Sequence, residues 1–163
     1  MDELQARRAW FKEYFDSAST MIRNSRPDRY WYTCPVCGYP CHIERGGFDI
    51  CDLCGWEDDD QDDPHADEIW GGPNGDYSLA EARENFAACR TKYRPGTRGF
   101  ELDGPGTETN ERVRTIVAKF DALRRLDSAN WDRRLARSFW REIIDLSHAD
   151  YGELPPPTDE GTV

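Results

Sequence analysis

The chain has 163 residues, a length that predicts one domain, or one small module with added helices, and argues against a multidomain enzyme. Only 37% of the residues are hydrophobic and the mean hydropathy is -0.87, so we expect a small core that depends on the aromatic residues, 12% of the chain. The net charge of -11 disfavours nonspecific binding to nucleic acid and favours a basic partner.

The sequence lacks the usual signals of a membrane or secreted protein. No window approaches the roughly 18 consecutive apolar residues of a membrane span. The first residues, Met1-Asp2-Glu3-Leu4, do not follow the basic-then-apolar order of a secretion signal. We therefore expect a cytoplasmic protein with no membrane partner.

The first predicted element is an amphipathic helix over residues 2–24, which ends ahead of Pro27. Apolar residues recur in it at spacings of three and four, which places them on one helical face. Residues 1–26 thus form an N-terminal helical unit. The residues at these spacings are Leu4, Arg7, Phe11, Tyr14, Phe15, Ala18, Met21 and Ile22.

The next segment contains two CxxC pairs, Cys34-Pro35-Val36-Cys37 and Cys51-Asp52-Leu53-Cys54, separated by 13 residues. This spacing is close to that of four-cysteine zinc sites. Gly38 and Gly55 follow the pairs and tolerate the positive φ that a turn around a metal ion requires. The pattern predicts one structural Zn²⁺ per chain, and a four-thiolate site has no open position for chemistry.

Other interpretations of the cysteines remain open. Two disulfides would need an oxidising compartment, and a redox or iron centre would also use CxxC pairs. Cys41 and His42 lie close enough in sequence to replace a ligand, although the symmetric pairs favour Cys41 as a bystander. Cys89 is expected to be a small buried apolar residue.

An acidic segment follows the cysteines. Between Glu57 and Cys89 the chain has 11 acidic residues and only one basic residue, Arg83, which gives a local charge of -10. The run beginning at Asp58 fails the EF-hand pattern, because Asp63 and Ile69 stand where glycine and glutamate are needed. We expect solvated carboxylates, whose replacement by amides would leave the fold intact.

Three further residues in this region invite a functional interpretation. His65 is one histidine without a positioned nucleophile, so we interpret it as a surface residue. Trp56 and Trp70 flank the acidic run and are either core residues, the favoured interpretation, or anchors of an interface.

The rest of the chain is predicted to be helical with one long loop. Ser78-Leu79-Ala80-Glu81 is a capping box that opens a helix of about 11 residues toward Cys89. Residues 95–109 are expected to be a loop, 110–150 an antiparallel helical pair and 151–163 a disordered tail. The apolar faces of the pair are Val113, Ile116, Val117, Phe120 and Leu123 in the first helix and Trp131, Leu135, Phe139, Ile143 and Leu146 in the second.

These elements predict an α+β fold in which a small four-cysteine zinc ribbon of short β-hairpins, within residues 27–94, packs with several amphipathic helices. Residues 32–93 resemble the bacterial cysteine-rich CPCC family. The resemblance rests on four strings: Cys34-Pro35-Val36-Cys37-Gly38-Tyr39, Cys51-Asp52-Leu53-Cys54-Gly55-Trp56-Glu57-Asp58-Asp59, Gly71-Gly72-Pro73-Asn74 and Ser78-Leu79-Ala80-Glu81-Ala82-Arg83-Glu84-Asn85.

Two residues depart from the family pattern. Val36 replaces its middle cysteine and Asp52 its usual proline, and neither change removes a CxxC pair. The resemblance therefore supports Cys34, Cys37, Cys51 and Cys54 as the ligand set. It also implies an accessory or immunity-type binding module more than an enzyme.

The first functional hypothesis is a zinc-stapled module that neutralises a basic protein, such as a nuclease-type toxin. Its binding residues would be Glu57, Asp58, Asp59, Asp60, Asp62, Asp63 and Trp70. Alternatively the acidic segment only confers solubility. A second hypothesis is a nucleic-acid-binding or transcription-linked zinc ribbon that uses the basic region 90–126, with nine basic and five acidic residues. An enzyme that uses the acidic loop and a divalent ion has the least support.

Overall fold

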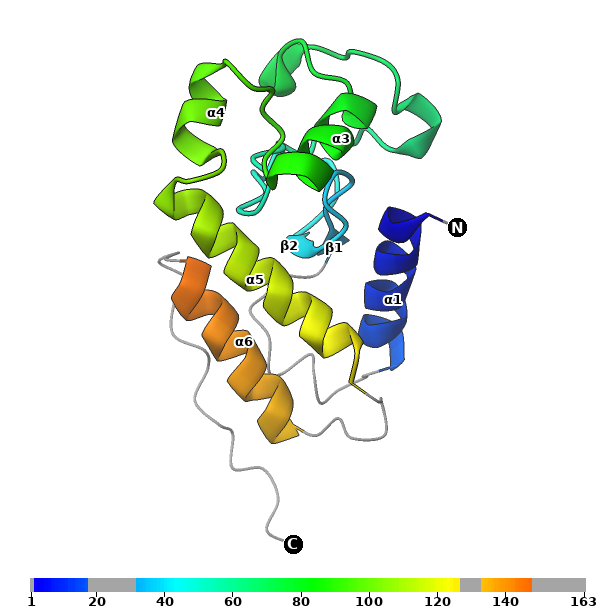
Figure 1. Ribbon diagram of the computed structural model, residues 1–163. Helices are drawn as coiled ribbons and strands as arrows, with labels where there is room; N and C mark the ends of the chain where they lie inside the picture. The colour runs from blue at the N-terminus through cyan, green and yellow to red at the C-terminus, as the bar shows by residue number, and fades with distance from the viewer. Residues whose placement is uncertain (1, 18–31, 127–132, 148–163) are drawn as a thin grey trace, which may run out of the picture.

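The computed structural model describes residues 2–17, 32–126 and 133–147 and surrounds two cysteine hairpins with helices α1, α3 and α5 (Figure 1). The α+β class is confirmed. Within these ranges no helix is long and apolar enough to cross a membrane. The elements in chain order are α1 (Glu3–Ser17), β1 (Tyr32–Thr33), β2 (Pro40–His42), the 3₁₀ turns η2 (Asp63–His65) and η3 (Gly72–Asn74), α3 (Leu79–Cys89), α4 (Arg98–Asp103), α5 (Glu108–Arg124) and α6 (Arg133–Ser147).

The strands are short because each cysteine pair folds back on itself within a few residues. β1 pairs antiparallel with β2, so that Tyr32 lies opposite His42. In the second hairpin a single antiparallel bridge joins Ile50 to Glu57. These hairpins correspond to the predicted ribbon.

Helix α3 begins at the predicted capping box. Ser78 is the N-cap, and its side chain accepts a hydrogen bond from the backbone N–H of Glu81 at 3.1 Å. Helix α5 buries all five residues of its predicted apolar face, Val113, Ile116, Val117, Phe120 and Leu123. The local sequence therefore predicts correctly where α3 begins and which face of α5 is buried.

Helix α6 runs antiparallel to α5 and packs beside it (Figure 1). Trp140 and Ile143 are fully buried on this side, whereas Leu135, predicted on the same face, is 39% exposed. Trp131 lies outside the described residues. The buried face of α6 is therefore centred on Trp140. The neighbouring Phe139, predicted on this face, is only partly buried.

The aromatic residues join the cysteine hairpins and the helices into one core. The ring of Tyr39, which follows the first knuckle, stacks on Phe120 of α5 at 5.4 Å. Phe11 of α1 makes T-shaped contacts with both rings, and the ring centroids of Trp140 of α6 and Phe120 are 5.9 Å apart. Tyr39 also donates a hydrogen bond to Asp121 at 2.8 Å.

Some boundaries differ from the sequence prediction. The segment 95–109, expected to be a loop, contains α4, whose N-cap Thr97 accepts a hydrogen bond from the N–H of Phe100. Six residues are too few to show a helical period. The first helix is described only as far as Ser17, and the predicted tail 151–163 lies outside the described residues.

Candidate metal centre

The first CxxC pair forms a tight turn closed by backbone hydrogen bonds. The N–H of Gly38 donates to the carbonyl of Cys34, and the N–H of Cys34 donates to the carbonyl of Tyr39, both at 2.9 Å. Gly38 has φ +72°, a conformation that glycine adopts without a steric penalty. The N–H of Val36 also points to Sγ of Cys34 at 3.4 Å, as expected around a thiolate ligand.

The second CxxC pair repeats this turn. The N–H of Gly55 donates to the carbonyl of Cys51 at 2.9 Å, and the N–H of Cys51 donates to the carbonyl of Trp56 at 2.8 Å. Gly55 has φ +80°. The chain thus makes two equivalent knuckles, each of which presents two sulfur atoms on one side.

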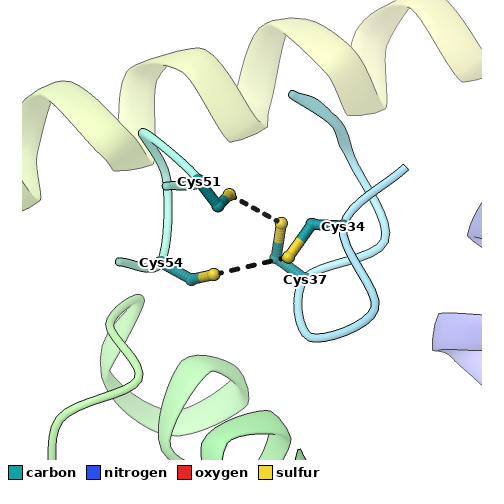
Figure 2. A group of neighbouring side chains, drawn as sticks. All are labelled: Cys34, Cys37, Cys51 and Cys54. Carbon is teal, nitrogen blue, oxygen red and sulfur yellow. Dashed lines mark hydrogen bonds between the residues drawn. The ribbon is translucent and has the colours of Figure 1, made fainter. Parts of the chain in front are cut away.

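The two knuckles direct their four sulfur atoms toward one another (Figure 2). The sulfurs of Cys34 and Cys54 are 3.6 Å apart, those of Cys37 and Cys51 are 3.7 Å apart, and all four lie within 4.8 Å of one another. A tetrahedron with Zn–S bonds of about 2.3 Å has edges of about 3.8 Å. The four side chains can therefore hold a metal ion without rearrangement.

All four cysteines are buried, and their pKa values differ between the knuckles. Burial raises the pKa of each thiol, but hydrogen bonds with neighbouring thiols outweigh it at Cys34, whose pKa lies well below its usual range, and lower the pKa of Cys37 to about 6. Burial and the first knuckle raise the pKa values of Cys51 and Cys54. The first knuckle thus favours the thiolate form that a metal ion requires.

The remaining two cysteines have different environments. Cys41 is 1% exposed and His42 fully buried, and their donor atoms lie with Sγ of Cys34 in a second group whose members are within 4.8 Å of one another. Burial lowers the pKa of His42, but contact with Cys34 and nearby negative charges raise it to about 9. Cys89 is half-buried, not fully buried as predicted.

The family model described as Cysteine-rich CPCC matches residues 32–98. We call these matched residues the CPCC segment. The match ends at residue 98 instead of the predicted 93 and covers about two fifths of the chain. Searches of curated proteins and of solved structures found no match to the chain.

Asp58 contradicts the expectation that the acidic residues of the CPCC segment are solvated. Its side chain is 0% exposed and accepts hydrogen bonds from Nε of Arg45 at 2.7 Å and from the N–H of Gly46 at 3.1 Å. Arg45 lies in the loop between the two knuckles, so the ion pair closes this loop onto the acidic run. Asp58 therefore has a structural role.

Asp62 and Asp63 are also engaged by arginines from distant parts of the chain. Both guanidinium Nη atoms of Arg8 in α1 donate to Asp62 at 2.8 Å, and Arg45 donates to it at the same distance. Arg83 of α3 donates to Asp63 at 2.6 Å. Partial burial raises the pKa of Asp62, but its bonds with Arg8 and Arg45 hold that pKa well below the usual range.

The carboxylates of the other three residues in the predicted acidic binding set, Glu57, Asp59 and Asp60, form no ion pairs among the described residues. The backbone N–H of Glu57 donates to Asn74, which also donates to a carboxylate oxygen of Asp59 at 3.4 Å. Asp60 is exposed and has φ +73°. Only part of the acidic run is therefore available to a partner.

The two tryptophans have opposite environments. Trp56 is 0% exposed and belongs to the core as favoured, whereas Trp70 is 44% exposed. The indole N–H of Trp70 donates to Glu68 at 2.9 Å, and the other carboxylate oxygen of Glu68 lies 3.1 Å from Nδ1 of His65. His65 is a surface residue as predicted, and no sequence signal indicates that Glu68 orients the neighbouring indole.

The predicted basic face of region 90–126 is interrupted by internal contacts. Lys92 is buried and donates to Asn74 at 2.8 Å. Arg94 pairs with Asp76 and Glu81. Three other basic residues of this region also contact polar groups within the molecule: Arg98 contacts Glu101, Arg114 contacts the buried Asn110 and Lys119 contacts Glu142.

Proposed function

We propose that the CPCC segment binds one Zn²⁺ ion through Cys34, Cys37, Cys51 and Cys54 and that the ion stabilises the fold. The observation that carries this proposal is the convergence of four buried sulfurs at spacings near those of a zinc–thiolate tetrahedron. A four-thiolate set also suits iron–sulfur chemistry. Four protein ligands leave no open position on zinc, so the ion would bind no substrate.

Metal analysis of the purified chain tests this part of the proposal. We expect about one zinc per chain, and loss of that zinc in Cys54→Ser, because three thiolates and a shorter hydroxyl bind zinc less tightly. Cys89→Ser is the control and retains the metal, since Cys89 lies outside both donor groups. Iron in place of zinc, or full zinc content in Cys54→Ser, would contradict the proposal.

We propose further that the zinc-stapled fold is a protein-binding module with a basic partner, and that Trp70 is the centre of the contact. Trp70 is exposed yet held in position by Glu68. An aromatic side chain oriented before binding loses little conformational freedom on association, which favours an anchoring role. Glu68 places a negative charge directly beside it, and Asp67 precedes Glu68 in the sequence.

An immunity or inhibitor protein is the class that this surface fits best. An enzyme that acts on nucleic acid carries a cationic active site, and an acidic surface would accelerate association with it and then cover it. Asp58 and Asp62 would support this surface from within the molecule. Asp60 and Asp67, both exposed and without an ion pair among the described residues, would contribute to steering.

Cross-linking of the intact chain in its host, followed by kinetics with the captured protein, tests the second part. A specific partner is basic, is lost with Trp70→Ala, and associates more slowly with the double variant Asp60→Asn/Asp67→Asn. Leu102→Ala, at an exposed apolar residue on α4, is the matched control and leaves binding unchanged. Retention of the partner by Trp70→Ala, or a salt-dependent shift of nucleic acid without any protein partner, would favour the basic region 90–126 instead.

A further inference from the structure

His42 places an imidazole ring in the interior of the protein. It ends strand β2, and its side chain is 0% exposed. Neither Nδ1 nor Nε2 has a hydrogen-bond partner among the described residues. A buried polar group without a hydrogen bond is destabilising, so a partner that forms in the functional state is expected.

The nearest candidate partner is the sulfur of Cys34. A ring nitrogen of His42 and the sulfurs of Cys34 and Cys41 lie within 4.8 Å of one another. Four thiolates around a divalent ion carry a net charge of about -2, which makes each sulfur a strong acceptor. An imidazole has at least one N–H in either protonation state, so the donor is always present.

We propose that His42 donates a ring N–H to the thiolate of Cys34 when the metal centre is occupied. This inference rests on the proposed zinc site and makes His42 a positioning residue rather than a ligand. The bond would join the Val36 N–H as a second donor to the same sulfur. A ligand role is disfavoured because the four cysteines already form a closed tetrahedral set, whereas Cys34, Cys41 and His42 supply only three donors.

Nuclear magnetic resonance of the intact chain, loaded with an NMR-active cadmium isotope and isotopically labelled histidine, tests the bond without a mutation. We expect one cadmium per chain and one His42 ring N–H that exchanges slowly with solvent and shows a weak coupling to cadmium across the hydrogen bond. A direct one-bond coupling between cadmium and a ring nitrogen, or a second bound ion, would show a ligand and overturn the proposal. A His42 ring N–H that exchanges rapidly with solvent and shows no coupling to cadmium would overturn the proposal as well.

Two substitutions at the same position provide a second test. His42→Leu removes the donor, whereas His42→Gln keeps an N–H, so metal affinity in competition with a chelator should fall about 10–100-fold in the first and less in the second. The sulfur-to-metal charge-transfer bands of the cobalt-substituted protein should shift in His42→Leu only. His65→Leu, at an exposed histidine, is the control.

The outcomes separate this inference from the zinc proposal. A wild-type chain that binds no metal contradicts the proposed function itself. A wild-type chain that binds one ion, with equal affinity and equal spectra in His42→Leu, His42→Gln and wild type, contradicts only the role of His42. If His42→Leu fails to fold, the resonance experiment on the wild-type chain still decides between donor, ligand and neither.

Discussion

At the scale of single residues, Asp58 shows how a charge can be buried in an acidic segment. Its carboxylate is inaccessible to solvent and is held by Arg45 and by backbone N–H groups. Removal of one member of a buried ion pair leaves the other without compensation. We predict that Asp58→Asn lowers the free energy of unfolding by about 3 kcal/mol, measured by urea denaturation of the metal-loaded chain.

The control for that prediction is Asp60→Asn, two residues further on. Asp60 is exposed, so its substitution should change the free energy of unfolding by less than about 0.5 kcal/mol. Equal effects of the two substitutions would mean that the Arg45 contact does not stabilise the fold.

Asp62 gives a prediction about pH. Its folded-state pKa is depressed by Arg8 and Arg45 despite partial burial, so its contribution to stability is present above the unfolded pKa of about 3.9 and is lost as pH falls toward the folded pKa. We predict that the gap in unfolding free energy between wild type and Asp62→Asn is constant from pH 7 to about pH 5 and shrinks as the pH falls from about 4 to about 2.5, because the unfolded state then binds the proton first. A gap that stays constant over that acidic range, with both chains in the same metal state, would show a pKa that is not depressed.

At the scale of elements, the two equivalent knuckles differ in what packs against them. A Cβ added at Gly38 would lie 2.8 Å from Cδ1 of Leu4 in α1, whereas one added at Gly55 would lie 3.4 Å from Tyr93. Both glycines have positive φ, so alanine at either costs about 1–2 kcal/mol through backbone strain.

We predict that Gly38→Ala has an additional effect on α1, which can be seen as faster hydrogen exchange of the α1 amides, and that Gly55→Ala does not. Leu4→Ala in the Gly38→Ala background should restore part of the protection, because it removes the clashing methyl groups. The same exchange rates in both glycine variants would mean that α1 does not depend on the first knuckle.

At the scale of the whole molecule, the four clustered cysteines and the helices share one core. Tyr39 follows the first knuckle directly and stacks on Phe120 of α5, which in turn contacts Trp140 of α6. We predict that removal of the metal by a chelator unfolds the cysteine hairpins and the helices in one transition. The near-ultraviolet circular dichroism of these aromatic residues should then be lost together with the helical signal. Two separate transitions, with the helical signal retained after chelation, would contradict a single cooperative unit.

The features that the sequence predicts correctly are those whose cause is local. The knuckles follow from two cysteines and a glycine within five positions, the start of α3 from Ser78 and Glu81, and the buried face of α5 from its own period. Each of these signals lies within one element, so it does not depend on which distant segment packs beside it.

The failures concern contacts between distant segments. The acidic run is predicted to be solvated because no basic residue lies beside it in sequence, yet Arg8 lies 54 positions from Asp62 and reaches it from α1. The exposure of Leu135 likewise depends on how α6 is rotated against α5, which its own spacing does not determine. The sign of the charges and their spacing along the chain cannot reveal ion pairs that form only when the chain folds.

The bonds from α1 have a consequence for the modularity of the chain. Arg7 donates to the carbonyl of Cys37 at 2.6 Å, and Arg8 compensates Asp62, so a helix outside residues 32–98 completes polar groups inside them. On the C-terminal side, Tyr39 inside the segment stacks on Phe120, which lies outside it. A polypeptide trimmed to the CPCC segment would expose an aromatic surface and would lose Arg8 as a partner of Asp62, although Arg45 and Arg83 would remain. We therefore expect it to aggregate, and we expect that the limits of the family match are not the limits of an independently folding unit.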